Sequence, residues 1–345
     1  MDRMVLRLAL CLLLCACAPS TRSTPSPSPT LRPYPTLTTV PLPSPTVTST
    51  LTPAPSPTQP PTPTSTPSPS PTPRRAVPNF DHIFIIAFEN KEYDLVIGNS
   101  DMPVLNRLAK QYTLLSQYYA IMHPSLPNYM AMIGGDTFGF TTNYPDQPVD
   151  APSLPDLLEA SGRTWKTYQE SMPAPCGLQD TLLYVQKHNP FVYFASIRNN
   201  PARCKAGVVP LGELDRDLQK NTLPHFGFIM PNLCNSSHDC ELSVSDQWLA
   251  VWGMKLVNAP GFLQNSLLFI TWEEGTGEHT CCGLKTGGGR VAAVLVSALV
   301  RKGFNDKTPY THYSLLRTIS TAWDLPLLAN AAKQEHALIE IPFRP

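Results

Sequence analysis

Hydrophobic positions along the chain follow two patterns, continuous apolar runs and runs with helical spacing. Residues 82–88 read HIFIIAF, an unbroken apolar run that is typical of a strand buried on both faces of a parallel sheet. Residues 102–112 instead place apolar side chains at intervals of three and four between Val104 and Tyr112, which predicts a helix. The chain therefore contains both strands and helices.

The same two patterns alternate through the rest of the chain. We expect further strands at residues 113–119, 164–168, 226–230, 267–272 and 291–296. We expect further helices at residues 126–135, 153–160, 245–257 and 312–323. Ser153 is the expected N-cap of its helix, with Asp156 completing a capping box. Strands separated by helices predict an α/β fold, a three-layer α/β/α sandwich with a mostly parallel central sheet.

The amino terminus has the pattern of an export signal. Arg3 and Arg7 accompany a short apolar run at residues 8–14, which is too short to span a bilayer and is typical of a signal peptide. The run leads into the sequence LCAC, which resembles the bacterial lipobox, so we expect residues 1–17 to be a lipoprotein signal with Cys17 acylated. An ordinary signal peptide cut near Ala18 is the alternative.

A low-complexity segment follows the signal. It holds 19 of the 39 prolines between Pro19 and Pro73, mostly with Ser and Thr, and no carboxylate occurs between Arg7 and Asp81. Such a composition cannot bury a core and favours extended polyproline II, so residues 18–75 are expected to be a disordered stalk. Residues 76–345 remain as the globular domain, which we expect to be extracytoplasmic and lipid-anchored to the bacterial cell membrane.

Charge and cysteine usage narrow the class of protein. Six of the 26 basic residues but only one of the 26 acidic residues precede residue 76, so the domain is acidic and a nucleic-acid partner is disfavoured. The domain holds six cysteines, for which 15 disulfide pairings are possible. We favour Cys234 with Cys240 and Cys176 with Cys204, and the neighbouring Cys281 and Cys282 stay open. No CxxC pair supports a zinc site.

Polar side chains follow three of the expected strands. Glu89-Asn90 follows the first, Glu273-Glu274 follows the strand at 267–272, and the loop LCNSSHDC with His238 follows the strand at 226–230. Ligands of open α/β sheets bind beyond the carboxyl ends of the strands. Clustered carboxylates repel unless a cation neutralises them, and oxygen ligands favour Mg²⁺, Ca²⁺ or Mn²⁺. Solvated strand ends without a cation are the alternative.

A nucleophile candidate lies in the sequence MHPSLPNY. Ser125 precedes an expected helix, where free N–H groups favour an anion, and a serine beside a metal could attack phosphorus. The alternative is that Ser125 only caps the helix. The chain has no GxSxG elbow and no GxxxxGK[ST] or GxGxxG loop, so an α/β-hydrolase and a nucleotide-binding loop are disfavoured.

The motifs together resemble a known family. FENKEYDLVIG, HPSLPNYMAMIGG, KHNPFVYF, PNLCNSSHDC, TWEEG and TPYTHYSLLRTI are similar to the phosphoesterase family of bacterial acid phosphatases and phosphatidylinositol-phosphate phosphatases. Phospholipases C are wider relatives, and the fold is alkaline-phosphatase-like. The resemblance runs from about His82 to Ala331. It implies a metal-dependent phosphomonoesterase that acts through a phosphoserine.

The resemblance also implies roles for individual residues. One divalent metal ion would be held by Glu89, Asn90, Ser125, Glu273 and Glu274. The catalytic residues would be Ser125 as nucleophile, His238 as the acid that protonates the leaving oxygen, and His312. The residues that contact the phosphomonoester substrate would be Asn128, His123, His188 and Arg290. For each histidine, a structural hydrogen-bonding role is the alternative. We expect a monomer.

Three positions depart from the family pattern. Glu273 stands where Asp is usual, Ser236 stands where a carboxylate is usual, and Arg290 stands where a histidine is frequent. The last change argues against a two-zinc site; Arg290 could clamp phosphate oxygens or merely be exposed. These departures leave open a degenerate binding module at the cell surface. A phospholipase C-type phosphodiesterase also stays open, because the same site would serve for phospholipid headgroups.

Overall fold

A mixed β-sheet is the centre of the domain. The computed structural model describes residues 75–145 and 147–343, and in these ranges nine strands form one sheet. The strands are β1 (His82–Phe88), β2 (Thr113–Tyr119), β3 (Trp165–Gln169), β4 (Val208–Pro210), β5 (Phe226–Met230), β6 (Ser266–Trp272), β7 (Arg290–Val296), β8 (Phe304–Asp306) and β9 (Tyr310–Thr311). Their order is β4-β3-β5-β1-β6-β7-β2-β8, and β9 pairs with β2.

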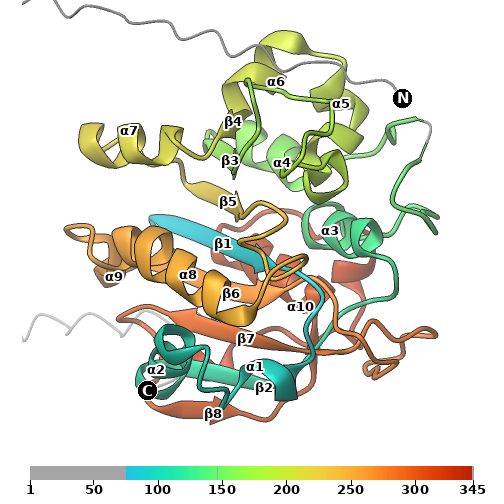
Figure 1. Ribbon diagram of the computed structural model, residues 1–345. Helices are drawn as coiled ribbons and strands as arrows, with labels where there is room; N and C mark the ends of the chain where they lie inside the picture. The colour runs from blue at the N-terminus through green and yellow to red at the C-terminus, as the bar shows by residue number, and fades with distance from the viewer. Residues whose placement is uncertain (1–74, 146, 344–345) are drawn as a thin grey trace, which may run out of the picture. The chain divides into compact units, whose positions relative to one another are not determined.

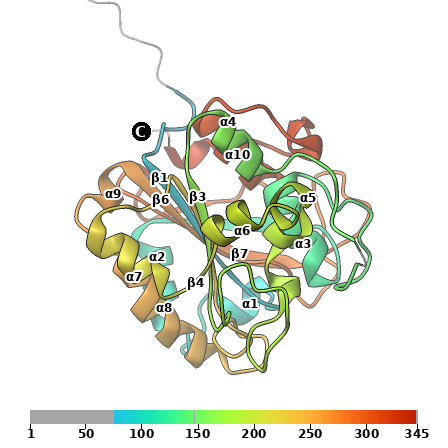
Figure 2. The ribbon, with the colours of Figure 1, turned by 90° about the horizontal axis from the view of Figure 1, so that it is seen from above.

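Helices cover both faces of this sheet. They are α1 (Tyr93–Val96), α2 (Pro103–Gln111), α3 (Ser125–Gly134), α4 (Leu154–Ala160), α5 (Ala195–Arg198), α6 (Pro201–Gly207), α7 (Glu213–Lys220), α8 (Leu242–Val257), α9 (Phe262–Asn265) and α10 (His312–Ala322). Figures 1 and 2 show α2, α7, α8 and α9 on one face and α3, α4 and α10 on the other. The predicted three-layer sandwich is therefore confirmed.

Strand direction follows from the connections. β1, β5, β6, β3 and β4 are mutually parallel, and β2 is parallel to β8 and β9. Only β7 runs antiparallel to both of its neighbours among the described strands. Residues 273–289 join β6 to β7 and contain no helix. Without a crossover helix the chain does not return to the end of the sheet where the parallel strands begin, so β7 runs in the reverse direction.

The predicted elements are confirmed with small shifts in their ends. All six expected strands are present, and the core strands β1, β5 and β6 are buried almost throughout. Ser153 caps α4 in a capping box with Asp156, as expected. The helix expected from Ser245 begins earlier, at Leu242. The sequence analysis missed β4, β8 and β9, because strands of two or three residues are too short for a periodic pattern.

Other expectations concern the amino terminus and the cysteines. The expected signal, Cys17 and the proline-rich segment up to residue 74 lie outside the described residues. Arg75, the first described residue, forms an ion pair with Asp324 at 2.7 Å. Both favoured disulfides form, Cys176–Cys204 and Cys234–Cys240, and Cys281 pairs with Cys282. Among the described helices, none has the length and apolar character needed to cross a membrane.

Candidate active site at the carboxyl ends of the strands

Two carboxylates meet because their strands are neighbours. In the parallel pair of β1 and β6, which lie side by side in Figure 1, Phe88 is opposite Trp272. The next residues, Glu89 and Glu273, therefore leave the sheet at the same level. The backbone N–H of Glu273 donates to the Phe88 oxygen at 3.0 Å. Both carboxylates are fully buried. The sequence prediction that these strand ends converge is therefore supported by the register of the sheet.

Ser125 lies against this acidic cluster. It is the first residue of α3 and is buried, and its hydroxyl donates to Glu274 Oε1 at 2.9 Å and approaches Glu89 Oε2 at 3.3 Å. No side-chain hydrogen bond caps this helix. The alternative that Ser125 only caps α3 is thus contradicted by the direction of its hydroxyl group.

Asn128 shapes the loop that presents Ser125. Its side chain is fully buried; Oδ1 accepts from the backbone of Ile121 at 2.8 Å and of Met122 at 3.3 Å. Its Nδ2 donates to the backbone oxygens of Met122 at 2.7 Å and Pro124 at 3.2 Å. Asn128 was expected to contact the substrate. Both polar atoms of its side chain are instead occupied by the loop backbone, so neither is free for a substrate.

The pKa values of the three carboxyl groups shift in different directions. Burial acts to raise the pKa of Glu89, but the nearby His188 ring and hydrogen bonds from Glu273 and Tyr129 outweigh burial and lower it. Burial, and then the negative charges of Glu89 and Glu274, raise the pKa of Glu273 well above its usual range. Burial also raises the pKa of Glu274. Three carboxyl groups this close cannot all ionise without a neutralising cation.

Imidazoles complete the cluster on the far side of Glu89. His188 is buried and its Nε2 lies 2.9 Å from Glu89 Oε1, yet it is not aligned for a hydrogen bond. Burial lowers the pKa of His188, although the neighbouring Glu89 carboxylate acts to raise it. An imidazole nitrogen that carries no proton is a common metal ligand. Among the described residues, Glu89, His188 and His238 offer ligand atoms that all lie within 4.8 Å of one another.

Two buried atoms of this cluster lack a hydrogen-bond partner in the described part of the chain, His188 Nε2 and Glu273 Oε1. A buried polar atom without a partner is costly, and a cation would satisfy both. The donor set of carboxylates, a hydroxyl and imidazoles therefore fits a divalent metal ion. Asn90 contributes its backbone N–H, which donates to Glu273 Oε2 at 3.1 Å; its side chain has no shown role.

The remaining predicted histidines occupy distinct positions. His123 pairs through Nδ1 with Glu274, and its Nε2 lies 3.1 Å from the Gly277 oxygen. Burial would lower the pKa of His123, but the Gly277 carbonyl and Glu274 outweigh it and raise the pKa. His238 Nδ1 lies 2.5 Å from Asp239.

His312 is fully buried behind the acidic cluster rather than open to it. Its Nε2 lies 2.6 Å from the backbone oxygen of Glu273, and Nδ1 lies 3.1 Å from the Tyr118 hydroxyl. Burial lowers the pKa of His312 to about 4. Both ring nitrogens of His312 are bonded, and one of them holds the backbone of Glu273. His312 therefore has the structural hydrogen-bonding role that was the alternative to catalysis.

Arg290 has partners outside the cluster. Its guanidinium donates to Asp94 at 2.6 Å and lies over the Tyr93 ring at 4.4 Å. The structure thus binds Arg290 to α1, which is neither the phosphate clamp nor the free exposed residue that the sequence left open. Ser236 is buried, and its backbone oxygen accepts from Glu89 N at 2.9 Å, so this departure from the family pattern still helps to place Glu89.

Three residues around the cluster were not predicted from the sequence. The Tyr129 hydroxyl donates to Glu89 Oε1, Lys187 Nζ lies 3.3 Å from His238 Nε2, and Glu92 joins two glycine-rich segments beside Glu274. Tyr129 could have been found, because it is four residues after Ser125 and so lies on the same face of α3. The contacts of Lys187 and Glu92 are made across the fold and carry no local sequence signal.

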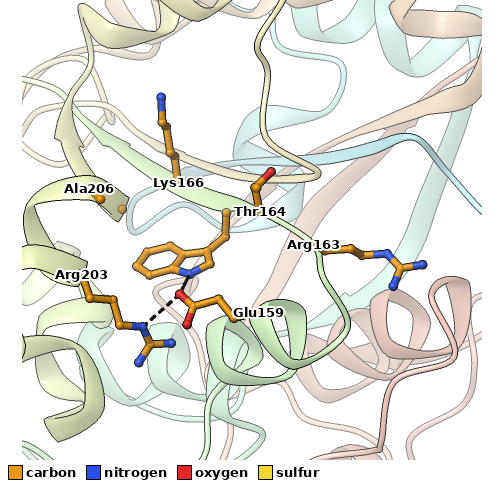
Figure 3. Close-up of a pocket in the computed structure, with 8 residues that line it drawn as sticks. Glu159, Arg163, Thr164, Lys166, Arg203 and Ala206 are labelled. Carbon is orange, nitrogen blue, oxygen red and sulfur yellow. Dashed lines mark hydrogen bonds and ion pairs between the residues drawn. The ribbon is translucent and has the colours of Figure 1, made fainter.

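A separate hollow, lined by Trp165, lies at the amino-terminal end of β3 (Figure 3). Trp165 begins β3, so it lies at the end of the sheet away from Glu89. Its indole donates to Glu159 Oε1 at 2.6 Å, and Arg203 Nε donates to the same oxygen at 3.0 Å. Because these polar groups satisfy one another, the hollow is not a candidate for the chemistry.

Comparison with known proteins agrees with the motifs. The model of the Phosphoesterase family matches residues 99–326. An acid phosphatase of Aspergillus fumigatus is 33% identical over 261 residues, which cover 72% of this chain and 56% of that protein. A phosphatidylinositol-3-phosphatase of Mycobacterium tuberculosis is 31% identical over 265 residues, covering 73% of this chain and 79% of that protein. The chain thus spans little more than half the length of the fungal relative.

Solved structures share the fold. A putative sulfatase from Bacteroides thetaiotaomicron superposes with a TM-score of 0.52 at 11% identity, covering 76% of this chain and 74% of that one. The lipoteichoic acid synthase LtaP from Listeria monocytogenes superposes with a TM-score of 0.51 at 12% identity, covering 74% and 76%. At this identity the likeness shows the architecture alone.

Proposed function

Because the chain belongs to the phosphoesterase family, as its motifs predicted, we propose that it is a metal-dependent phosphomonoesterase whose nucleophile is Ser125. The acid phosphatase of Aspergillus fumigatus supports a monoester substrate. The proposal rests above all on one contact: the Ser125 hydroxyl donates to Glu274 inside a cluster of three buried carboxyl groups. A serine that only stabilised a helix would not direct its proton into this cluster.

The buried carboxylates would hold the cation. Glu89, Glu273, Glu274 and the Ser125 hydroxyl would supply oxygen ligands, and His188, whose Nε2 lies 2.9 Å from Glu89 Oε1, would supply a nitrogen ligand. A bound divalent ion neutralises negative charge on the phosphoryl oxygens and favours ionisation of a neighbouring hydroxyl. The metal is expected to be Mg²⁺, Ca²⁺ or Mn²⁺, since most of the donors are oxygens.

The reaction begins with Ser125. Its Oγ attacks phosphorus while the bond to the leaving-group oxygen breaks, and its proton passes to Glu274 Oε1, which already accepts it at 2.9 Å. Burial raises the pKa of Glu274, so this carboxylate is a better proton acceptor than an exposed one. Water then attacks the phosphorus of the phosphoserine and gives a proton to His238, which has lost its own to the leaving oxygen. The bond between phosphorus and Ser125 Oγ breaks, Oγ takes back its proton from Glu274, and phosphate is released.

His238 is the proposed acid for the leaving oxygen. Its Nδ1 lies 2.5 Å from Asp239 Oδ1, and this contact fixes the orientation of the ring. Lys187 adds a positive charge beside the same ring. A proton donor and a cation beside the acidic cluster would act where charge develops on the leaving group and the phosphoryl oxygens.

The proposed location rests on the sequence alone. The apolar run at residues 8–14, the LCAC sequence and the proline-rich segment support a domain that is held outside the membrane by a lipid on Cys17. Three disulfides in the described domain are compatible with an oxidising compartment.

Turnover of defined substrates tests the activity. The purified full chain, stripped with a chelator, should hydrolyse p-nitrophenyl phosphate only after Mg²⁺, Ca²⁺ or Mn²⁺ is restored. A diester, bis-p-nitrophenyl phosphate, should react far more slowly. A faster diester reaction would favour the phosphodiesterase alternative, and a folded, metal-loaded chain without turnover of either ester would favour the binding module.

A further inference from the structure

Glu92 joins the two ends of one long loop. The loop, residues 275–289, connects β6 to β7 and is called the arm from here on. Glu92 Oε1 accepts the backbone N–H of Gly277 at 2.7 Å, and Oε2 accepts the backbone N–H of Arg290 at 3.2 Å. One carboxylate thus holds the start of the arm against its end.

Glycines make room for this carboxylate. A Cβ atom at Gly275, Gly277 or Gly289 would lie only 2.5, 2.8 or 2.6 Å from Glu92 Oε1. Such distances are far below van der Waals contact, so any larger residue at these positions would displace the Glu92 side chain. Gly289 also has a φ of +91°, which favours glycine on its own account. The base of the arm is therefore built around the Glu92 side chain.

A chain of contacts runs from Glu92 to Ser125. The backbone N–H of Gly277 donates to Glu92. The carbonyl oxygen of Gly277 lies 3.1 Å from His123 Nε2. His123 Nδ1 pairs with Glu274 Oε2. The other oxygen of Glu274 accepts the Ser125 hydroxyl at 2.9 Å. Every link is a polar contact of defined partners, and Glu274 is joined directly to the arm by the peptide bond to Gly275.

We propose that Glu92 is a positioning residue that sets the placement of Glu274 against Ser125 by fixing the base of the arm. The inference rests on the proposed function, since it assigns Glu92 a part in the same site. Glu92 itself touches neither Ser125 nor the buried carboxylates, so its effect passes through Gly277 and His123. Both of its oxygens act as acceptors, which a carboxamide cannot reproduce because its nitrogen would face a backbone N–H.

Mutation of Glu92 tests this inference by two readouts. The Glu92→Gln and Glu92→Ala variants of the full chain should bind Mn²⁺ about 10–100-fold more weakly by calorimetry, and kcat should fall by a similar factor with KM for p-nitrophenyl phosphate little changed. Glu335→Gln is the matched control, because Glu335 is an exposed carboxylate beside the arm at Gly283. This control should match the wild type in both readouts.

A double-mutant cycle separates positioning from general stability. Gly277→Ala alone pushes a methyl group against Glu92 and should weaken Mn²⁺ binding. In a Glu92→Ala background the same change has no carboxylate to displace, so it should cost little more. If Glu92→Ala fails to fold, Gly277→Ala alone still probes the contact.

The outcomes distinguish the two proposals. An active wild type with unchanged Mn²⁺ affinity and kcat in Glu92→Gln, or with additive effects in the cycle, overturns the role of Glu92 and leaves the phosphatase intact. A wild type that binds no Mn²⁺ and turns over no phosphomonoester removes the proposed function itself.

Discussion

Glu89 and Glu273 lie side by side because the strands before them are parallel neighbours in matched register, with Phe88 opposite Trp272. The contact therefore follows from the sheet and needs no special loop. Ser125 and Tyr129, in the first turns of α3, both direct their hydroxyl groups to Glu89. Burial of these groups has consequences for pH, stability and metal binding that can be measured.

Stability without metal should depend on pH through Glu273. Its pKa is raised in the folded chain, so above the unfolded value of about 4.5 the folded state holds an extra proton and loses stability as the pH rises. The Glu273→Gln variant does not titrate at this position. Urea unfolding in the presence of a chelator, between about pH 5 and pH 7, gives the free energy of unfolding of both proteins. The value for the variant should rise relative to that of the wild type by up to about 1.4 kcal/mol per pH unit. A difference that stays constant with pH contradicts the assignment.

Tyr129 should stabilise the ionised form of Glu89. Tyr129→Phe removes a buried hydrogen bond to a charged group, so the free energy of unfolding should fall by about 1.5–3 kcal/mol. Mn²⁺ should also bind more weakly, because Glu89 loses its orientation. Tyr112→Phe, a buried tyrosine just after α2, is the control for loss of a hydroxyl. Equal small effects of the two changes would count against this role.

The two longer-range disulfides should differ in their effects. Replacing Cys234 and Cys240 by serine opens a short loop and should cost about 2 kcal/mol, whereas the pair Cys176 and Cys204 closes a longer loop and should cost about 3–4 kcal/mol. Only the first change should lower turnover strongly, since that loop carries His238. Denaturant unfolding and steady-state kinetics of both double variants check this. The reverse order of activity losses would be inconsistent with a catalytic His238.

The site of lipid attachment can be tested by fractionation. Cys17→Ser should prevent acylation and move the protein from the membrane to the soluble fraction, because the apolar run at residues 8–14 is too short to span the bilayer. Turnover of p-nitrophenyl phosphate, a soluble substrate, should be unchanged per mole of enzyme. A variant that remains in the membrane fraction to the same extent as the parent contradicts the lipoprotein interpretation.

Long periodic segments made the fold predictable from the sequence. The apolar run of β1 and the carboxylates after β1 and β6 could be found, because strand ends of a parallel sheet meet at one edge. The parts that could not be predicted depend on contacts across the fold. The burial of His312 behind Glu273, the pairing of Arg290 with Asp94, and the insertion of Glu92 between glycines have no local pattern.

The most direct test of the central claim is to trap the covalent intermediate. The metal-loaded full chain is mixed with a phosphomonoester, quenched in acid within the first turnover and digested, and the peptide that spans residues 122–129 is examined by mass spectrometry. We expect one phosphate on Ser125 in the wild type, none in Ser125→Ala, and a loss of turnover by several orders of magnitude in that variant while it remains folded. A folded Ser125→Ala enzyme with turnover near that of the wild type would show that Ser125 is not the nucleophile.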